Sequence, residues 1–68
     1  MARVIPDGGR FLKPESAAAK FDRGRSWVWE RVKRDPTFPR PIYLAPKAPL
    51  FIEAELDAWA ASRVAEAA

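Results

Sequence analysis

The sequence contains neither cysteine nor histidine among its 68 residues. The lack of cysteine excludes a disulfide framework and a thiolate metal site, and the lack of histidine excludes the other usual zinc ligand. The same two absences remove the commonest general base and leave serine as the main candidate nucleophile, at positions 16, 26 and 62. We therefore expect a protein that is not an enzyme and that uses no metal or cofactor.

A long apolar run is also missing from the sequence. No stretch approaches the ~20 residues that a membrane span needs, and residues 1–10 lack the apolar segment of a signal peptide. We expect a cytoplasmic protein without a membrane partner. Hydrophobic residues make up 49% of the chain and aromatic residues 12%, which favours one small folded domain over a disordered tail.

The charges are divided unevenly along the chain, although the formal net charge is only +3. Residues 10–34 hold eight lysines or arginines and three acids, whereas residues 53–68 hold four acids and one arginine. A basic half joined to an acidic half predicts one face for a polyanion and another that supports the fold.

Turn-forming residues divide the first third of the chain. Pro6 to Gly9 form a turn cluster, so we expect a flexible arm over 1–10 and a domain over 11–68 that starts at the apolar pair Phe11-Leu12. A proline at the first helical position, followed by glutamate and three alanines, predicts a helix over 14–21. We expect Gly24 to supply the positive φ of the turn that follows.

A second helix is predicted over 27–34, with Ser26 as its N-cap and Pro36 beyond its end. Val28 and Val32 share one face, four residues apart. On this projection the following residues point away from the valines: Ser26, Trp27, Glu30, Lys33 and Arg34. A basic second helix after a glycine-bearing turn is typical of a helix-turn-helix.

Two β-prone triplets, 42–44 and 50–52, flank the five residues 45–49 and predict a hairpin with Lys47 near its tip. We expect Phe38, Tyr43 and Phe51 to lie in the core or at the base of this hairpin.

The last segment, 53–67, is predicted to be an amphipathic helix. Its apolar residues recur at helical spacing: Leu56, Trp59, Ala60, Val64 and Ala67. Three acids, Glu53, Glu55 and Asp57, lie in its first turns, where the helix dipole explains them more simply than a metal site does.

The order of elements predicts an α+β, mainly α fold: a winged helix-turn-helix with two short N-terminal helices, a two-stranded β-hairpin wing and a C-terminal amphipathic helix. An α-helix fits the major groove of B-DNA, and phosphates attract lysine and arginine. The alternative is a solvated basic face with Trp27 and Trp29 in the core. We assign Trp29 mainly to packing, whereas Trp27 fits either role. The candidate DNA-binding residues are Arg23, Arg25, Ser26, Trp27, Glu30, Arg31, Lys33, Arg34, Arg40 and Lys47.

Residues 11–64 also resemble a known family. The likeness lies in Phe11-Leu12 with Pro14-Glu15, in Arg25-Ser26 and Lys33-Arg34, in Phe38-Pro39-Arg40-Pro41, and in the segment from Glu53 to Trp59. In these elements the chain resembles AlpA-type phage regulators and small phage excisionases, relatives of the MerR winged-helix group. The resemblance implies binding to double-stranded DNA, and a basic residue at the wing tip, a role that Lys47 fits.

Two roles remain open on this resemblance, an excisionase that directs recombination and a transcription regulator of a phage or integrated element. Self-association on adjacent DNA sites and contact with a recombinase such as an integrase are further expectations. The alternative from another class is a protein interaction module whose basic face docks on an acidic partner. The DNA-binding end of a packaging terminase subunit is a third hypothesis.

Overall fold

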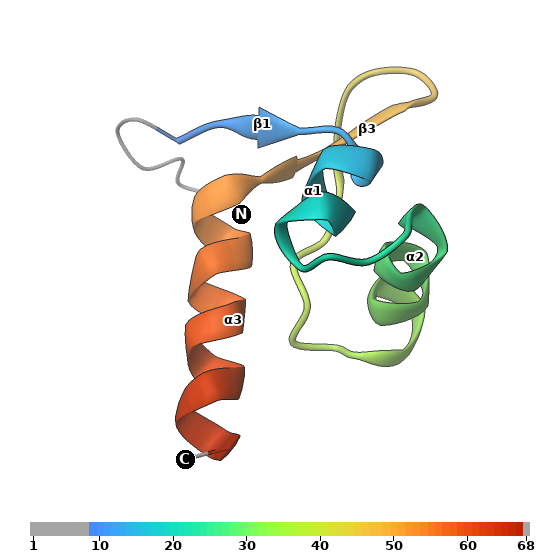
Figure 1. Ribbon diagram of the computed structural model, residues 1–68. Coiled ribbons are helices and arrows are strands. Elements are labelled where there is room, and N and C mark those ends of the chain that lie inside the picture. Colours follow the sequence, from blue (N-terminus) through green and yellow to red (C-terminus); the bar gives the residue numbers. More distant parts are fainter. Residues whose placement is uncertain (1–8, 68) are drawn as a thin grey trace.

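The computed structural model describes residues 9–67 of the chain (Figure 1). Three helices and a three-stranded antiparallel sheet of order β1-β3-β2 make an α+β domain of the winged-helix kind, as predicted. The elements are β1 (Phe11–Leu12), α1 (Pro14–Lys20), α2 (Arg25–Arg34), β2 (Ile42–Ala45), β3 (Ala48–Ile52) and α3 (Glu53–Ala67). The predicted arm 1–10 lies outside the described residues except for its last two.

The first helix, α1, ends within one residue of its predicted boundary. Pro14 begins it, and Ala17 and Ala18 are fully buried against the rest of the domain. The turn after α1 differs from the prediction, because Asp22 has the positive φ, 56°, and Gly24 has a φ of −89°. Aspartate tolerates the left-handed region because its short polar side chain can hydrogen-bond locally.

The helix α2 begins two residues earlier than predicted. Gly24 is the N-cap, and its carbonyl accepts a hydrogen bond from the Trp27 N–H at 3.1 Å. The prediction that Ser26 caps this helix is therefore wrong, because the extended backbone of Gly24 already makes the transition into the helix. Ser26 instead lies in the first turn with an exposed side chain.

The sheet has one strand that the sequence pattern did not reveal. Phe11 pairs with Ile52 and Leu12 pairs with Phe51, so that β1 adds a third strand beside β3. Next to this pairing, the carbonyl of Arg10 accepts a hydrogen bond from the Glu53 N–H at 2.8 Å. The start of the described chain is thereby joined to the start of α3.

The wing is a tighter hairpin than predicted. Its turn has two residues, Pro46 and Lys47, because Ala45 belongs to β2 and both Ala48 and Pro49 belong to β3. Proline fits at this point in β3 because β1 reaches only Phe51 and Ile52, so β3 has a single neighbouring strand near Pro49. The register between β2 and β3 is irregular on the β2 side, between Tyr43 and Ala45.

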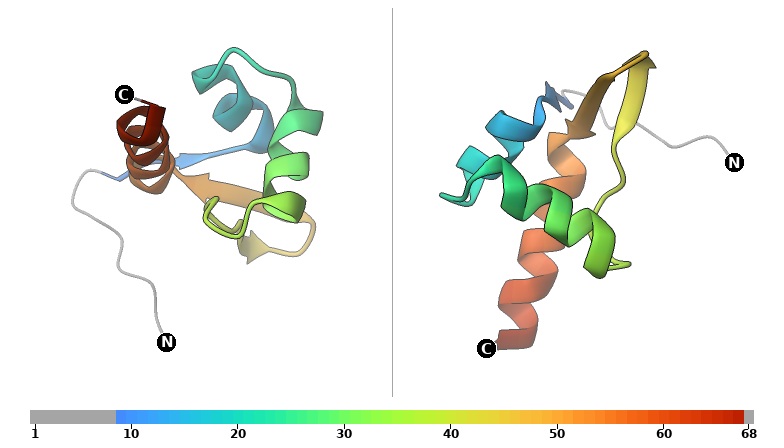
Figure 2. Two further views of the ribbon diagram at one scale, coloured as in Figure 1. Left: turned by 90° about the horizontal axis from the view of Figure 1, so that it is seen from below. Right: turned by 90° about the vertical axis from the view of Figure 1, so that its right-hand side faces the viewer.

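The core lies where the sheet meets all three helices. Its largest fully buried side chains include Phe38, Phe51 and Leu56, as expected for the first two. Tyr43 and Val64, by contrast, are 58% and 69% exposed, so Tyr43 is not part of the core and the apolar stripe of α3 is not buried at Val64. The stripe covers core only in the first half of α3, and the end of this helix extends beyond the other elements (Figure 2).

The helix α3 is attached to α1 by a bridging lysine. Lys20 Nζ lies 3.1 Å from Glu53 Oε2 and 2.9 Å from Asp57 Oδ1. Hydrogen bonds to Asp57 and to Glu53 raise the pKa of Lys20 above its ordinary value. Two of the acids thus hold α3 against α1. None of the helices in residues 9–67 is both long enough and apolar enough to cross a membrane.

Candidate nucleic-acid interface

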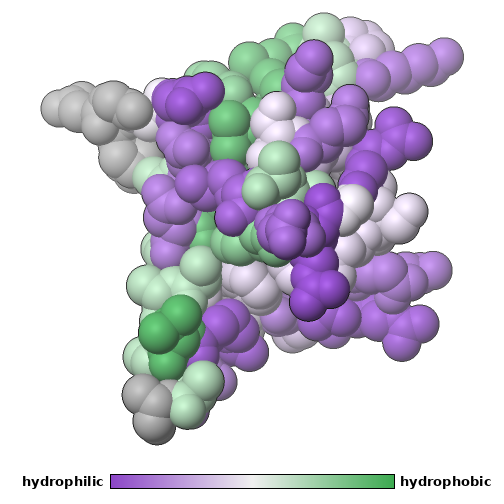
Figure 3. Space-filling model, viewed as in Figure 1, coloured by the Kyte–Doolittle hydropathy of each residue, from purple (hydrophilic) through white to green (hydrophobic). Residues whose placement is uncertain are grey.

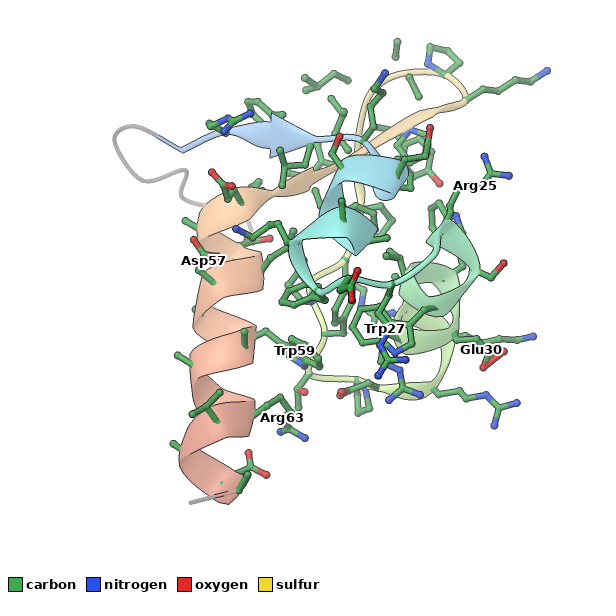
Figure 4. All side chains as sticks on the ribbon, in the orientation of Figure 1. Arg25, Trp27, Glu30, Asp57, Trp59 and Arg63 are labelled. Atoms are coloured by element: carbon green, nitrogen blue, oxygen red, sulfur yellow. The ribbon has the colours of Figure 1, made fainter. Side chains whose placement is uncertain are left out.

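The outer face of α2 is a row of exposed polar side chains. Val28 is fully buried and sets the inner side of the helix. The exposed residues of the opposite side are Ser26, Glu30, Lys33 and Arg34. Figure 4 shows Glu30 pointing outward from α2, away from α3. This row fits the sequence prediction, with the exception of Trp27.

One ion pair lies within the row. Arg34 Nε is 2.7 Å from Glu30 Oε1, four residues earlier on the helix. Their side chains are 68% and 50% exposed, and such exposed pairs contribute little to stability. The pair therefore leaves both groups accessible to a ligand.

Arg25 belongs to a different part of the surface, next to the wing. It lies on the rim of a groove between the start of α1, the start of α2 and the wing. We call this the wing groove; it is lined mainly by Lys13, Glu15, Arg25, Trp29, Lys47 and Leu50. Hydrophilic side chains project from the side of the molecule formed by α2 and the wing (Figure 3). We call the exposed residues Ser26, Glu30, Lys33 and Arg34 the α2 row. The α2 row and the wing groove together make one cationic side.

Lys47 has an unusual backbone conformation at the wing tip. Its φ is 63°, in the left-handed region that glycine and asparagine adopt more readily. A residue other than glycine costs about 1–2 kcal/mol in this conformation. The wing tip therefore carries a positive charge at a position where glycine would make the turn more stable.

Trp27 is not on the outer row. Its ring lies 5.6 Å from that of Phe21, 6.0 Å from Phe38 and 6.1 Å from Trp59, centroid to centroid, and it points from α2 toward Trp59 of α3 (Figure 4). The prediction that Trp27 points away from the core is wrong, because α2 packs against neighbours on two sides. Trp29, expected mainly in packing, lies 5.9 Å from Phe51.

Arg40 is engaged with the backbone at the end of α2. Its Nη1 donates to the Val32 carbonyl at 2.6 Å and its Nη2 to the Asp35 carbonyl at 2.7 Å. Carbonyls at the C-terminal end of a helix lack N–H donors from the helix itself. The helix dipole also favours a positive charge at this end. Arg40 therefore holds the end of α2 in place, a role that the sequence prediction, which assigned Arg40 to DNA, did not include.

The two remaining arginines differ in exposure. Arg23 is exposed in the turn before α2. Arg31 is half-buried, and its Nε has no hydrogen-bond partner within residues 9–67. Arg23 can reach a ligand without rearrangement, whereas Arg31 is partly covered by the fold.

The family model described as prophage CP4-57 regulatory protein (AlpA) matches residues 10–64. The chain belongs to the AlpA family. The match begins just before β1 and ends within α3, so it spans both the α2 row and the wing groove of this AlpA-family protein. No curated protein and no solved structure matches the chain. Family membership makes this a phage-type regulatory protein, as the resemblance implied.

Asp35 fixes the position of α2 relative to α3 in this AlpA-family chain. Its Oδ1 accepts hydrogen bonds from the Thr37 hydroxyl at 2.6 Å and the Thr37 N–H at 2.9 Å. Its Oδ2 accepts one from Trp59 Nε1 at 3.3 Å. The bonds from Thr37, first from the hydroxyl and then from the backbone, hold the pKa of Asp35 below its ordinary value.

This lowered pKa predicts an acid-dependent contribution of Asp35 to stability. Because the folded-state pKa lies below that of the unfolded chain, the contribution is complete above the ordinary value of 3.8 and is lost as the pH falls through the folded pKa. We expect Asp35→Asn to be less stable than the parent at pH 7 and to approach it as the pH is lowered from 5 to 2. Thermal melts across this range measure the difference, and a constant difference would contradict the role of the ionised carboxylate.

Proposed function

We propose that this AlpA-family protein binds double-stranded DNA in a sequence-specific manner, with α2 in the major groove and the wing beside it. The observation that carries the proposal is the gathering of exposed cations on one side of the molecule, from α2 and from the wing tip. An α-helix with its side chains is about 10–12 Å across, and the major groove is about 12 Å wide. The α2 row therefore suits this groove in size.

The two ends of α2 have different parts in the proposal. At its start, Ser26 can hydrogen-bond a base edge, and Arg25 can reach either a base edge or the phosphate beside it. Lys33 and Arg34, at its end, are placed for backbone phosphates, which fix orientation without reading sequence. Glu30 lies between them, where a carboxylate can accept from the amino group of cytosine. Arg23 is exposed beside the first group and is assigned to phosphate.

The wider role follows from the family and from DNA binding together. A regulator of this kind acts by occupying or bending DNA, either near a recombination site as an excisionase or near a promoter as a transcription regulator. Both roles use the same contacts and place the protein in the cytoplasm, where bacterial DNA lies. Contact with an integrase and association of copies on adjacent sites belong to the excisionase form of the proposal.

Fluorescence anisotropy on a random duplex, and on DNA flanking the gene, tests this proposal when the salt concentration is varied. Four phosphate contacts give a slope of about −3.6 in log affinity against log salt, which is roughly a 100-fold loss of affinity between 50 and 200 mM. Lys33→Ala should weaken binding to both duplexes alike, whereas Ser26→Ala should weaken only the specific complex. A flat salt response would refute DNA binding and favour a protein interaction module.

A further inference from the structure

The wing groove combines a cationic rim with an apolar floor. Three cations reach it from three separate elements: Lys13 precedes α1, Arg25 begins α2, and Lys47 lies in the wing turn. Trp29, Pro49 and Leu50 line its apolar part. The groove has a volume of about 570 Å³, within the roughly 300–1,000 Å³ of sites that hold small ligands or parts of larger ones.

We propose that one strand of the DNA duplex runs through the wing groove, with a phosphate held among Lys13, Arg25 and Lys47 and the adjoining deoxyribose against Trp29 and Leu50. This inference rests on the proposed function, and it extends the interface from α2 and the wing to the segment before α1. The chemistry of a sugar–phosphate unit matches the groove, since an anionic phosphate alternates with a largely apolar sugar ring. Phosphate and sugar take half to two-thirds of protein–DNA hydrogen bonds.

The backbone that carries the three cations is ordered by the fold. The Lys13 carbonyl accepts a hydrogen bond from the Ala17 N–H at 2.8 Å, which ties Lys13 to the first turn of α1. Arg25 is part of α2, and Lys47 is confined to a two-residue turn. A strand bound here therefore orders few backbone torsions, which reduces the entropic cost of binding.

Glu15 gives the groove an internal test, because it lines the same groove with the opposite charge. A phosphate seated among the three cations is repelled by this carboxylate. Neutralising Glu15 should therefore tighten DNA binding, while neutralising Lys13 should weaken it. The two residues lie two positions apart in sequence. A loss of folding at this place would weaken DNA binding by both variants, whereas the proposal predicts changes of opposite sign.

The experiment measures salt-dependent anisotropy on a random duplex for Lys13→Gln, Glu15→Gln and the matched control Arg63→Gln. Lys13→Gln should lower the salt slope by about 0.9, which corresponds to roughly tenfold weaker binding at 0.1 M salt. Glu15→Gln should bind severalfold tighter. Arg63 lies on α3 in an exposed pair with Glu66, and its substitution should leave the slope unchanged.

A second measurement tests whether DNA contacts Trp29 in the apolar part of the groove. Protein labelled with fluorotryptophan gives one ¹⁹F signal for each of its three tryptophans, and Trp29→Phe identifies the signal of Trp29. On adding duplex, the Trp29 signal should shift more than those of Trp27 and Trp59, which pack inside an aromatic cluster with Phe21 and Phe38.

The outcomes separate this inference from the proposed function. If the parent protein shows salt-dependent duplex binding while Lys13→Gln keeps the parental slope and the Trp29 signal does not move, the strand does not pass through the groove and only the α2 contacts remain. If the parent binds no duplex at all, the proposed function itself fails. Weaker binding by Glu15→Gln would also overturn the placement of the phosphate.

Discussion

Phe38→Ala is expected to remove most of the stability of the domain. Phe38 is 1% exposed, and its ring lies 4.9 Å from Trp59, 6.0 Å from Trp27 and 6.2 Å from Phe51. Truncation of a buried phenylalanine costs about 3–5 kcal/mol. Domains are stable by about 0.05–0.15 kcal/mol per residue, so a chain of this length has roughly 3–10 kcal/mol in total.

Circular dichroism in a urea titration measures this loss. The matched control is Leu44→Ala, since Leu44 is a large apolar residue with 66% of its surface exposed. Surface substitutions of this kind usually change stability by about 0.5 kcal/mol or less. If Phe38→Ala unfolds at the same urea concentration as the control, the aromatic cluster does not hold the three helices together.

Lys47→Glu is expected to weaken DNA binding strongly, because Lys47 carries the one charge in residues 42–52. It removes one phosphate contact and adds a repulsive charge, so the affinity at 0.1 M salt should fall by more than tenfold and the salt slope by about 1 or more. The fold should survive, because the side chain is exposed at a loop tip. Anisotropy on a random duplex, with a thermal melt of the same sample, measures both effects.

The backbone of Lys47 provides a sharper control than the charge reversal. Lys47→Gly relieves the left-handed conformation at φ 63° and should raise stability by about 1 kcal/mol while weakening binding about tenfold. Stability and binding should thus move in opposite directions. Normal binding by folded Lys47→Gly and Lys47→Glu would show that the wing tip faces away from DNA.

Helices with strong local signals could be predicted from the sequence. The acids in the first turns of α3, and the spacing of Leu56 and Trp59, are local patterns, and the helix spans the predicted residues. Periodicity did not show where the core ends along α3, however. Val64 continues the apolar stripe in sequence but lies beyond the elements that could cover it.

Features that depend on distant partners could not be predicted. The strand β1 has two residues, and only its pairing with Phe51 and Ile52 makes it a strand. The prolines of the wing favoured a long loop, but Pro49 is tolerated because β3 lacks a second neighbour there. Local composition does not contain this information.

The candidate site was predictable in its charges and less so in the directions of its side chains. A helical projection separated Lys33 and Arg34 from Val28 and Val32, but it placed Trp27 outward because it assumed a single packing partner. Arg40 was selected for its charge, whereas its place after α2 directs it to backbone carbonyls. Lys13 was missed because only the tertiary fold brings it to the wing groove.

The pairing of β1 with β3 has a consequence for biosynthesis. Phe11 and Ile52 are 41 positions apart in the sequence, and a contact of such long range costs loop-closure entropy before it contributes to stability. On the ribosome, α1 and α2 emerge before β3 and Leu56, the residues that complete their core. Until synthesis has passed Trp59, the nascent chain has its basic helix but lacks residues that complete the core supporting that helix.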